Sequence, residues 1–133
     1  MRRLLVPVLV ALSLSLVACR SQEGPAQRYR RFAELARAGK AEEAWAMLSS
    51  SSRARLEAQA KELAAHAPAG VLPTSGPELL LGDLSATAPR VKSVAMVRES
   101  RDAAVVAVQE EGGRKGEVQL VREDGAWRVV LPE

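Results

Sequence analysis

The chain has 133 residues and a formal net charge of +3, and 47% of its residues are hydrophobic and 26% are charged. This composition excludes an intrinsically disordered chain, and the length fits a single domain. Two of the 19 Lys and Arg residues lie in the first 18 positions, so 17 remain in the other 115 residues against 16 Asp and Glu, a balance that gives no electrostatic case for nucleic-acid binding.

The N-terminal segment has the pattern of a signal peptide. Arg2 and Arg3 precede an apolar run over residues 4–18. As a helix this run would span about 22 Å, which is shorter than the ~30 Å hydrocarbon core of a bilayer. The pattern therefore favours a cleaved signal peptide over a permanent membrane span.

The only cysteine of the chain follows this run, in the sequence Leu16-Val17-Ala18-Cys19. This tetrapeptide resembles the lipobox of bacterial lipoproteins. The resemblance implies that residues 1–18 are removed after Ala18 and that Cys19 carries a diacylglyceryl lipid, which would hold the protein at a membrane. The alternative is a buried thiol in an uncleaved anchor.

The residue after the cysteine bears on localisation. In Gram-negative lipoproteins an aspartate at this place favours retention at the inner membrane, and here it is Arg20. The resemblance thus implies the periplasmic face of the outer membrane if the organism has one. The mature domain would hold no free thiol, which suits an oxidising envelope compartment.

Residues 20–25 are polar, and Gly24 and Pro25 disfavour a helix, so we expect residues 19–25 to form a lipidated tether before a single domain over residues 26–133. Apolar spacing predicts a helix from Ala26 to about Gly39, a short second one from Ala41, and a third from about Arg53 to Pro68. Serine side chains accept hydrogen bonds from free N–H groups at helix starts, so the run Ser49–Ser52 should cap the third helix. The expected apolar faces are Tyr29, Phe32, Ala33 and Ala36; Ala44, Trp45 and Leu48; and Leu56, Ala60, Leu63, Ala64 and Ala67.

Residues 68–89 contain four of the seven prolines. Within them, Ser75 followed by Glu78 matches a capping box and predicts a helix of one or two turns that ends near Gly82. By its position, this segment is expected to cover the open side of a sheet as a lid.

The apolar period changes to two after residue 90. It predicts four strands, Val91–Arg98, Ala103–Gln109, Gly116–Arg122 and Ala126–Leu131, with Asp124-Gly125 as a two-residue hairpin turn. Short turns between successive strands predict an antiparallel meander. The expected fold class is therefore α+β, with N-terminal helices packed on a curled, cone-like, four-stranded antiparallel meander.

Three local features carry a resemblance for residues 26–133: an aromatic residue in the first helix, the segment Trp45-Ala46-Met47-Leu48-Ser49, and the segment from Asp124 to Val129. Through these features, residues 26–133 resemble small bacterial members of the nuclear transport factor 2-like superfamily. This superfamily includes ketosteroid isomerase-like, cystatin-like and lumazine-binding-like domains. The resemblance implies a cone that can hold a pocket, with Tyr29, Trp45 and Trp127 as lining residues.

Side chains suited to catalysis are few. A proton-transfer site needs a base with a shifted pKa beside a proton donor. Tyr29 shares a helix face with core residues, and His66 lies near a helix C-terminus, where the helix dipole favours its charged form. Of the carboxylates, only Glu117 lies within an expected strand, and the others are at strand ends or turns: Glu99, Asp102, Glu110, Glu111, Glu123 and Asp124.

A zinc site needs three or four ligands, and one histidine without a cysteine in the domain does not supply them. We therefore expect no catalytic residue, no metal and no cofactor. Arg28, Arg30, Arg31 and Arg37 could contact anionic lipid head groups. We favour the alternative that they form the solvated face of an amphipathic helix, with Glu34 and Glu42 nearby to pair with them.

The sequence thus predicts a lipid-anchored protein of the bacterial envelope with a non-catalytic binding or scaffold domain. Its expected partners are the membrane, through the lipid on Cys19, and an envelope protein or a small apolar ligand. The first alternative is a small cavity-containing enzyme or apolar-ligand-binding protein of the ketosteroid isomerase-like type. The second is an interaction module that uses an exposed edge of strand Val91–Arg98 or Ala126–Leu131.

Overall fold

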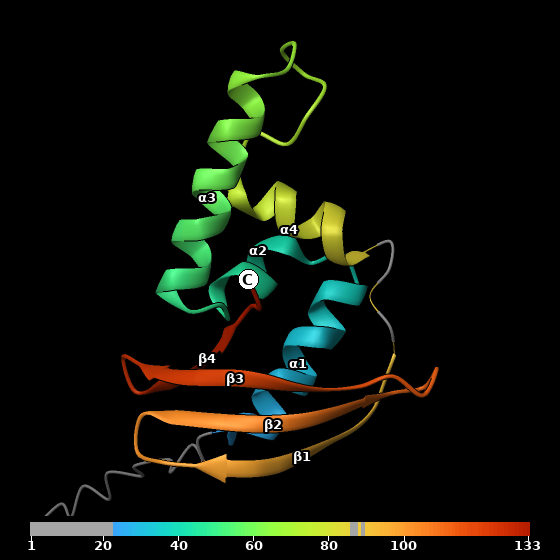
Figure 1. The fold of residues 1–133 in the computed structure, drawn as a ribbon, viewed down its shortest axis with the longest axis vertical. Coiled ribbons are helices and arrows are strands. Elements are labelled where there is room, and N and C mark those ends of the chain that lie inside the picture. The colour runs from blue at the N-terminus through green and yellow to red at the C-terminus, as the bar shows by residue number, and fades with distance from the viewer. Residues whose placement is uncertain (1–22, 86–87, 89) are drawn as a thin grey trace, which may run out of the picture.

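The computed structural model describes residues 23–85, 88 and 90–133. The expected signal peptide and Cys19 lie outside the described residues. In chain order the elements are α1 (Pro25–Arg37), α2 (Ala41–Ala46), α3 (Ser50–Ala65), α4 (Gly76–Ser85), β1 (Val91–Glu99), β2 (Ala103–Glu110), β3 (Lys115–Glu123) and β4 (Ala126–Val130) (Figure 1).

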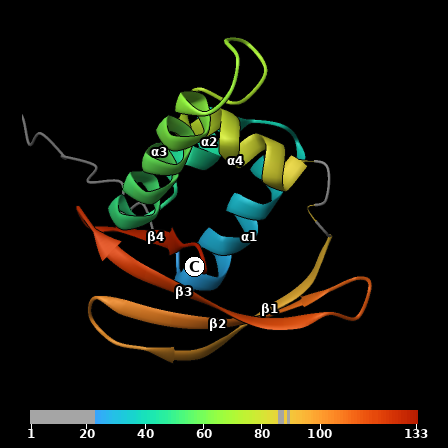
Figure 2. The same ribbon diagram turned by 45° about the horizontal axis from the view of Figure 1, so that its top comes forward.

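The strands form one antiparallel sheet in the order β1-β2-β3-β4. This confirms the α+β class, and the sheet is curled without closing (Figure 2). Among the described residues, we find no helix with the length and hydropathy needed to span a bilayer.

The serine run begins α3 three residues earlier than the expected start at Arg53. Ser49 is the N-cap, and its Oγ accepts a hydrogen bond from the Ser52 N–H at 3.2 Å. Ser49 and Ser52 are both buried. The Glu123 carboxylate accepts a second main-chain hydrogen bond at this end, from the Ser50 N–H at 3.1 Å. One serine and one carboxylate therefore cap the helix, and the other three serines lie within its first turn.

Replacing Ser49 with alanine is expected to lower the free energy of unfolding by about 1 kcal/mol, because the Ser52 N–H loses its acceptor. Urea unfolding monitored by circular dichroism measures this loss. The same change at exposed Ser93 in β1 serves as the control, with an expected effect within about 0.5 kcal/mol. Equal effects for the two variants would refute the capping role.

Helix α4 is longer than predicted and lies in a different place. It runs past Gly82 to Ser85, and its main neighbours are α1, α2 and α3. Half of the predicted capping box is present, because the Ser75 Oγ accepts a hydrogen bond from the Glu78 N–H at 3.4 Å, whereas the Glu78 carboxylate accepts from the Thr74 N–H at 2.9 Å instead of the Ser75 N–H. Gly82 does not adopt the positive φ of a C-terminal cap, so the helix continues through it. The expected lid over the sheet is thus wrong, since α4 covers other helices.

The β3–β4 hairpin has the predicted two-residue turn. Asp124 has φ 51° and Gly125 has φ 74°, and the flanking residues Glu123 and Ala126 face each other. Two successive positive φ angles are those of a type I′ turn, whose twist matches that of the strands.

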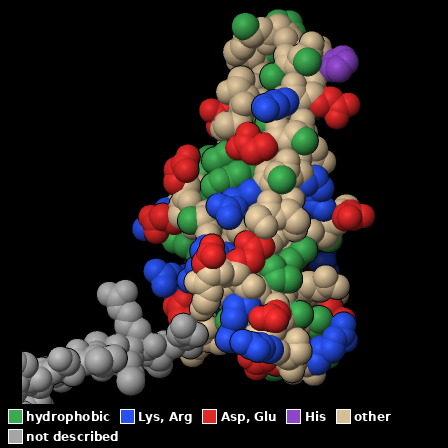
Figure 3. Space-filling view, turned by 90° about the vertical axis from the view of Figure 1, so that its left-hand side faces the viewer, with side chains coloured by type: hydrophobic (Ala, Val, Ile, Leu, Met, Phe, Trp, Pro, Cys, Tyr) green, Lys and Arg blue, Asp and Glu red, His purple; other side chains and the backbone are tan. Residues whose placement is uncertain are grey.

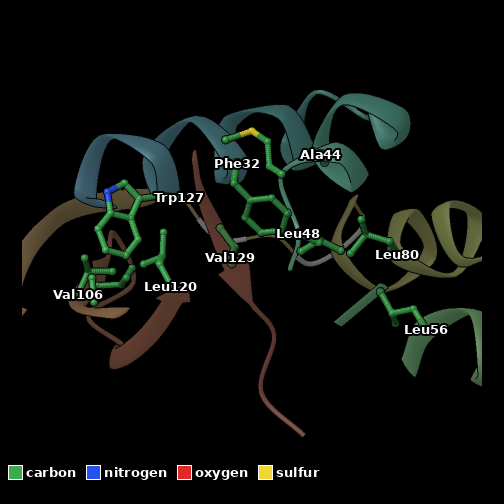
Figure 4. Close-up of a cluster of buried hydrophobic side chains, with 12 residues drawn as sticks. Phe32, Ala44, Leu48, Leu56, Leu80, Val106, Leu120, Trp127 and Val129 are labelled. Atoms are coloured by element: carbon green, nitrogen blue, oxygen red, sulfur yellow. The ribbon is translucent and has the colours of Figure 1, made fainter. Parts of the chain in front are cut away.

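The hydrophobic core joins the sheet to the helices. In Figure 4 the labelled side chains form a row from Val106, Leu120 and Trp127 on the sheet through Val129 and Leu48 to Leu56. Helix α1 packs on β1, β2 and β4, whereas α4 packs on other helices. The core therefore lies along the contact between α1 and the sheet, and it includes β4.

The outer edge of β4 is covered by the segment between α2 and α3. Leu48 forms a parallel bridge with Val129. The Ser49 N–H donates to the Val129 O at 2.8 Å, and the Val129 N–H donates to the Met47 O at 2.8 Å. Strand β1 is the other edge of the sheet, and its pairing with β2 has register shifts between Val91 and Ser93 and between Met96 and Arg98.

The second half of α3 extends away from the sheet (Figure 1). The expected apolar face is buried at Leu56 and Ala60, but Leu63 is 40% exposed and Ala64 is exposed. The prediction of a continuous buried stripe is wrong for this half, because α3 is longer than the core it packs on.

Candidate functional site

A cleft of about 600 Å³ lies between the first half of α3 and the ends of β3 and β4. Its lining residues are Ser51, Ser52, Arg55, Glu117, Val118, Gln119, Val130, Leu131, Pro132 and Glu133. It is more voluminous than two other clefts, of about 560 and 170 Å³, that are described below. It is the candidate binding site of the domain.

The chain that follows β4 forms one wall of this cleft, and two side chains of α3 hold it there. The Ser52 Oγ accepts a hydrogen bond from the Leu131 N–H at 3.0 Å. The Arg55 guanidinium donates to the main-chain oxygens of Leu131 at 3.2 Å and of Pro132 at 2.8 Å. Residues 131–133 therefore follow α3 instead of continuing along β3.

The lining of the cleft combines apolar and hydrogen-bonding groups. Val118 and Leu131 pack against the core and give the cleft an apolar part. Ser51, Gln119 and Glu117 are exposed and present polar groups. Such a lining can hold a ligand that has both an apolar side and groups able to form hydrogen bonds.

The three aromatic residues expected around a pocket belong to the core or pack against it. Trp127 is buried, and the Arg122 guanidinium lies 4.7 Å from the centroid of its ring. Trp45 and Tyr29 are half-buried against the same core. None of the three lines the clefts of 600, 560 or 170 Å³.

Tyr29 is the candidate proton donor. Its ring is tilted against Phe32 with 6.1 Å between centroids. Burial raises the pKa of the Tyr29 hydroxyl, and the nearby negative charge of Glu110 raises it further. Glu110 itself is half-buried and forms an ion pair with Arg114 at 3.5 Å. Tyr29 therefore stays protonated at neutral pH.

His66 lies at the C-cap of α3, and its Nδ1 is 2.8 Å from the main-chain oxygen of Glu62. With Gln59, Glu62, Leu63 and Leu79 it lines the cleft of about 560 Å³. This cleft is at the end of α3 that extends away from the sheet. The structure thus separates His66 from the cleft that contains Glu117.

The arginines of α1 divide into two groups. Arg28 and Arg31 form ion pairs with Glu23 at 3.3 and 3.1 Å, so the expected pairing of these arginines with Glu34 and Glu42 is wrong. Slight burial opposes ionisation of Glu23, but hydrogen bonds from Arg31 and Arg28 outweigh it and lower the pKa of Glu23. The other two arginines line the cleft of about 170 Å³, whose residues are Arg30, Ala33, Glu34, Arg37, Arg90, Val91 and Glu111.

Charge is otherwise mixed. Figure 3 shows acidic and basic side chains interspersed over one face of the molecule. Within residues 23–85, 88 and 90–133, no group of three or more His, Cys, Asp or Glu residues is placed to hold a metal ion.

Sequence reasoning placed Glu117 in a strand but did not find Ser52, Arg55 and Pro132 as neighbours in one cleft. Arg55 is 76 residues from Leu131 in the chain, and no local pattern links them. The available signal was Pro132, which directly follows an alternating strand and cannot donate a main-chain hydrogen bond.

No family model matches the chain, and a search of curated proteins gives no match.

Proposed function

We propose that the protein is a lipid-anchored component of the bacterial envelope whose domain binds another envelope component in the cleft between α3 and β3 without catalysing a reaction. The observation that carries the binding role is the wall made by residues 131–133, which Ser52 and Arg55 hold open beside β3. The anchor rests on the resemblance of Leu16–Cys19 to a lipobox.

The distribution of the titratable side chains supports binding over catalysis. Tyr29 and Glu110 lie near each other, but neither lines the cleft of about 600 Å³. His66 lines a different cleft at the far end of α3. General acid–base catalysis requires the donor and the base to reach one reacting group, and this arrangement disperses them.

A second candidate is a small enzyme of the ketosteroid isomerase-like type. One observation favours it, namely that partial burial and the nearby negative charge of Glu110 both raise the pKa of the half-buried Tyr29 hydroxyl. If the protein is such an enzyme, Tyr29→Phe would abolish its catalytic activity. If the protein instead binds a partner in the α3–β3 cleft, Tyr29→Phe would leave that binding unchanged.

Metabolic labelling with a clickable fatty acid tests the anchor. The wild-type chain is expected to incorporate the label and to sediment with membranes, and Cys19→Ala is expected to lose both properties, because no other thiol is present. Ser15→Ala, in the same segment, serves as a control that keeps the label. Equal labelling of Cys19→Ala would overturn the anchor.

Site-specific photo-crosslinking in intact cells tests the cleft. A photoreactive amino acid at Ser51, an exposed lining residue, is expected to give a discrete adduct with an envelope component. The same amino acid at Lys61, exposed on α3 but outside the cleft, is the control and should give none. The same result at both positions would contradict binding in the cleft.

A further inference from the structure

The two strands beside the cleft differ in length. β3 extends over Lys115–Glu123, but β4 pairs only with residues 119–123. Among the described residues, no strand lies beside residues 115–118 on the side of β3 that faces away from β2. Residues 115–118 of β3 therefore form an open edge, on the side where β4 pairs with the rest of the strand.

The register shows which main-chain groups are open there. Glu123 and Ala126 close the two-residue turn and form its hydrogen-bonded pair, so every second residue of β3 before Glu123 directs its main-chain N–H and C=O towards β4. The pairing of Gln119 with Val130 follows this alternation. The next such residue is Glu117, whose main-chain groups therefore point to the side that β4 leaves empty.

Two other hydrogen bonds agree with this alternation. The Arg122 N–H donates away from β4, to the Asp102 O at 2.9 Å. The Leu131 N–H donates away from β3, to the Ser52 Oγ. Both residues occupy the positions between hydrogen-bonded pairs, as the alternation requires.

Pro132 explains why β4 does not cover this edge. Continuing the register places Pro132 opposite Glu117, in a position where the strand must donate a main-chain N–H. Proline has none. Arg55 and Ser52 then draw residues 131–133 towards α3, and the cleft remains between them and β3.

We propose that this cleft binds an extended polypeptide segment of an envelope partner, which adds to β3 beside residues 115–118 and pairs with the main chain of Glu117. This inference rests on the proposed binding function and names the class of ligand. An extended chain supplies alternating N–H and C=O groups that match the open groups of Glu117. Its side chains would alternate between the apolar part of the cleft at Val118 and Leu131 and the solvent.

The other open edge of the sheet is less suited to strand addition. The pairing of β1 with β2 shifts register twice. Irregular pairing of this kind is a feature that protects edge strands from further pairing. In the open part of β3, by contrast, the pairing with β2 keeps one register, and Glu117 and Val118 line the cleft beside α3.

Amide hydrogen exchange measured by NMR on the full lipidated chain in detergent micelles tests the inference. The probe is the peptide acetyl-Thr-Val-Thr-Val-Thr-amide, and the matched control is the same peptide with its central nitrogen methylated. The unmodified peptide is expected to slow exchange of the Glu117 amide by about ten-fold, and the methylated one is expected to leave it unchanged.

A second variant tests the role of proline. Pro132→Val restores the missing N–H, so β4 can extend and cover Glu117 in the absence of the peptide. The Glu117 amide is then expected to be protected without the peptide, and affinity for the peptide is expected to fall by about ten-fold. Val130→Thr, which leaves Pro132 in place, is the control and should keep the open edge.

Unchanged exchange at Glu117 with the unmodified peptide, or protection confined to β1, would overturn strand addition at β3. If crosslinking from Ser51 still succeeds in that case, the cleft binds a ligand of another class and the proposed function stands. If the Ser51 crosslink is also absent, the proposed function itself fails. The two failures are therefore distinguishable.

Discussion

Leu48→Ala is expected to lower the free energy of unfolding by about 3 kcal/mol. Leu48 is fully buried, with an exposed fraction of 0%, and it lies between Val129 and the helical part of the core (Figure 4). Removing three buried carbon atoms loses their transfer free energy and leaves a cavity that the surrounding helices fill only in part. Urea unfolding monitored by circular dichroism measures the change.

Leu63→Ala is the matched control for this prediction. Leu63 is 40% exposed in the second half of α3, so its truncation is expected to change the free energy of unfolding by less than about 1 kcal/mol. A loss below about 1 kcal/mol for Leu48→Ala as well would show that residues 47–49 contribute little to the core.

Gly76→Ala is expected to lower the free energy of unfolding by about 1–3 kcal/mol. A Cβ atom at this position would overlap the indole of Trp45, lying 2.7 Å from Cζ3, and would be 2.8 Å from the Glu57 Oε1. Relief requires movement of Trp45, which packs against the core, and overpacking of this kind is destabilising. The measurement is again urea unfolding, with the Trp fluorescence spectrum reporting on the displaced ring.

Gly82→Ala, in the same helix, has the opposite expected sign. Nothing lies within 4 Å of a Cβ at Gly82, and alanine is a better helix former than glycine by up to about 1 kcal/mol. The pair separates a steric effect from helix propensity. Stabilisation by both substitutions would refute the contact between Gly76 and Trp45.

Local chemistry determines the parts of the fold that the sequence predicts well. The strand pattern and the Asp124-Gly125 turn need only nearby residues, and the structure has both. The α4 boundary was wrong because a glycine ends a helix only where its backbone turns left-handed, and Gly82 has no positive φ. The exposed second half of α3 was missed because periodicity shows which face is apolar and does not show how far the neighbouring elements extend.

The candidate site depends on long-range contacts, which explains why its shape was not predicted. The cleft exists because β3 is longer than β4 and because Arg55 and Ser52 bind the main chain of residues 131–132. The sequence places Pro132 after a strand, but only the β3–β4 register shows that it would face Glu117. The aromatic residues were expected in a pocket because of the family resemblance, and large apolar side chains equally favour burial in the core.

The bridge between Leu48 and Val129 also affects the order in which the domain can fold. Its two residues are 81 positions apart, and closing so long a loop precedes any gain from the contact. The helical half lacks part of its core until the strand Ala126–Val130 has been synthesised.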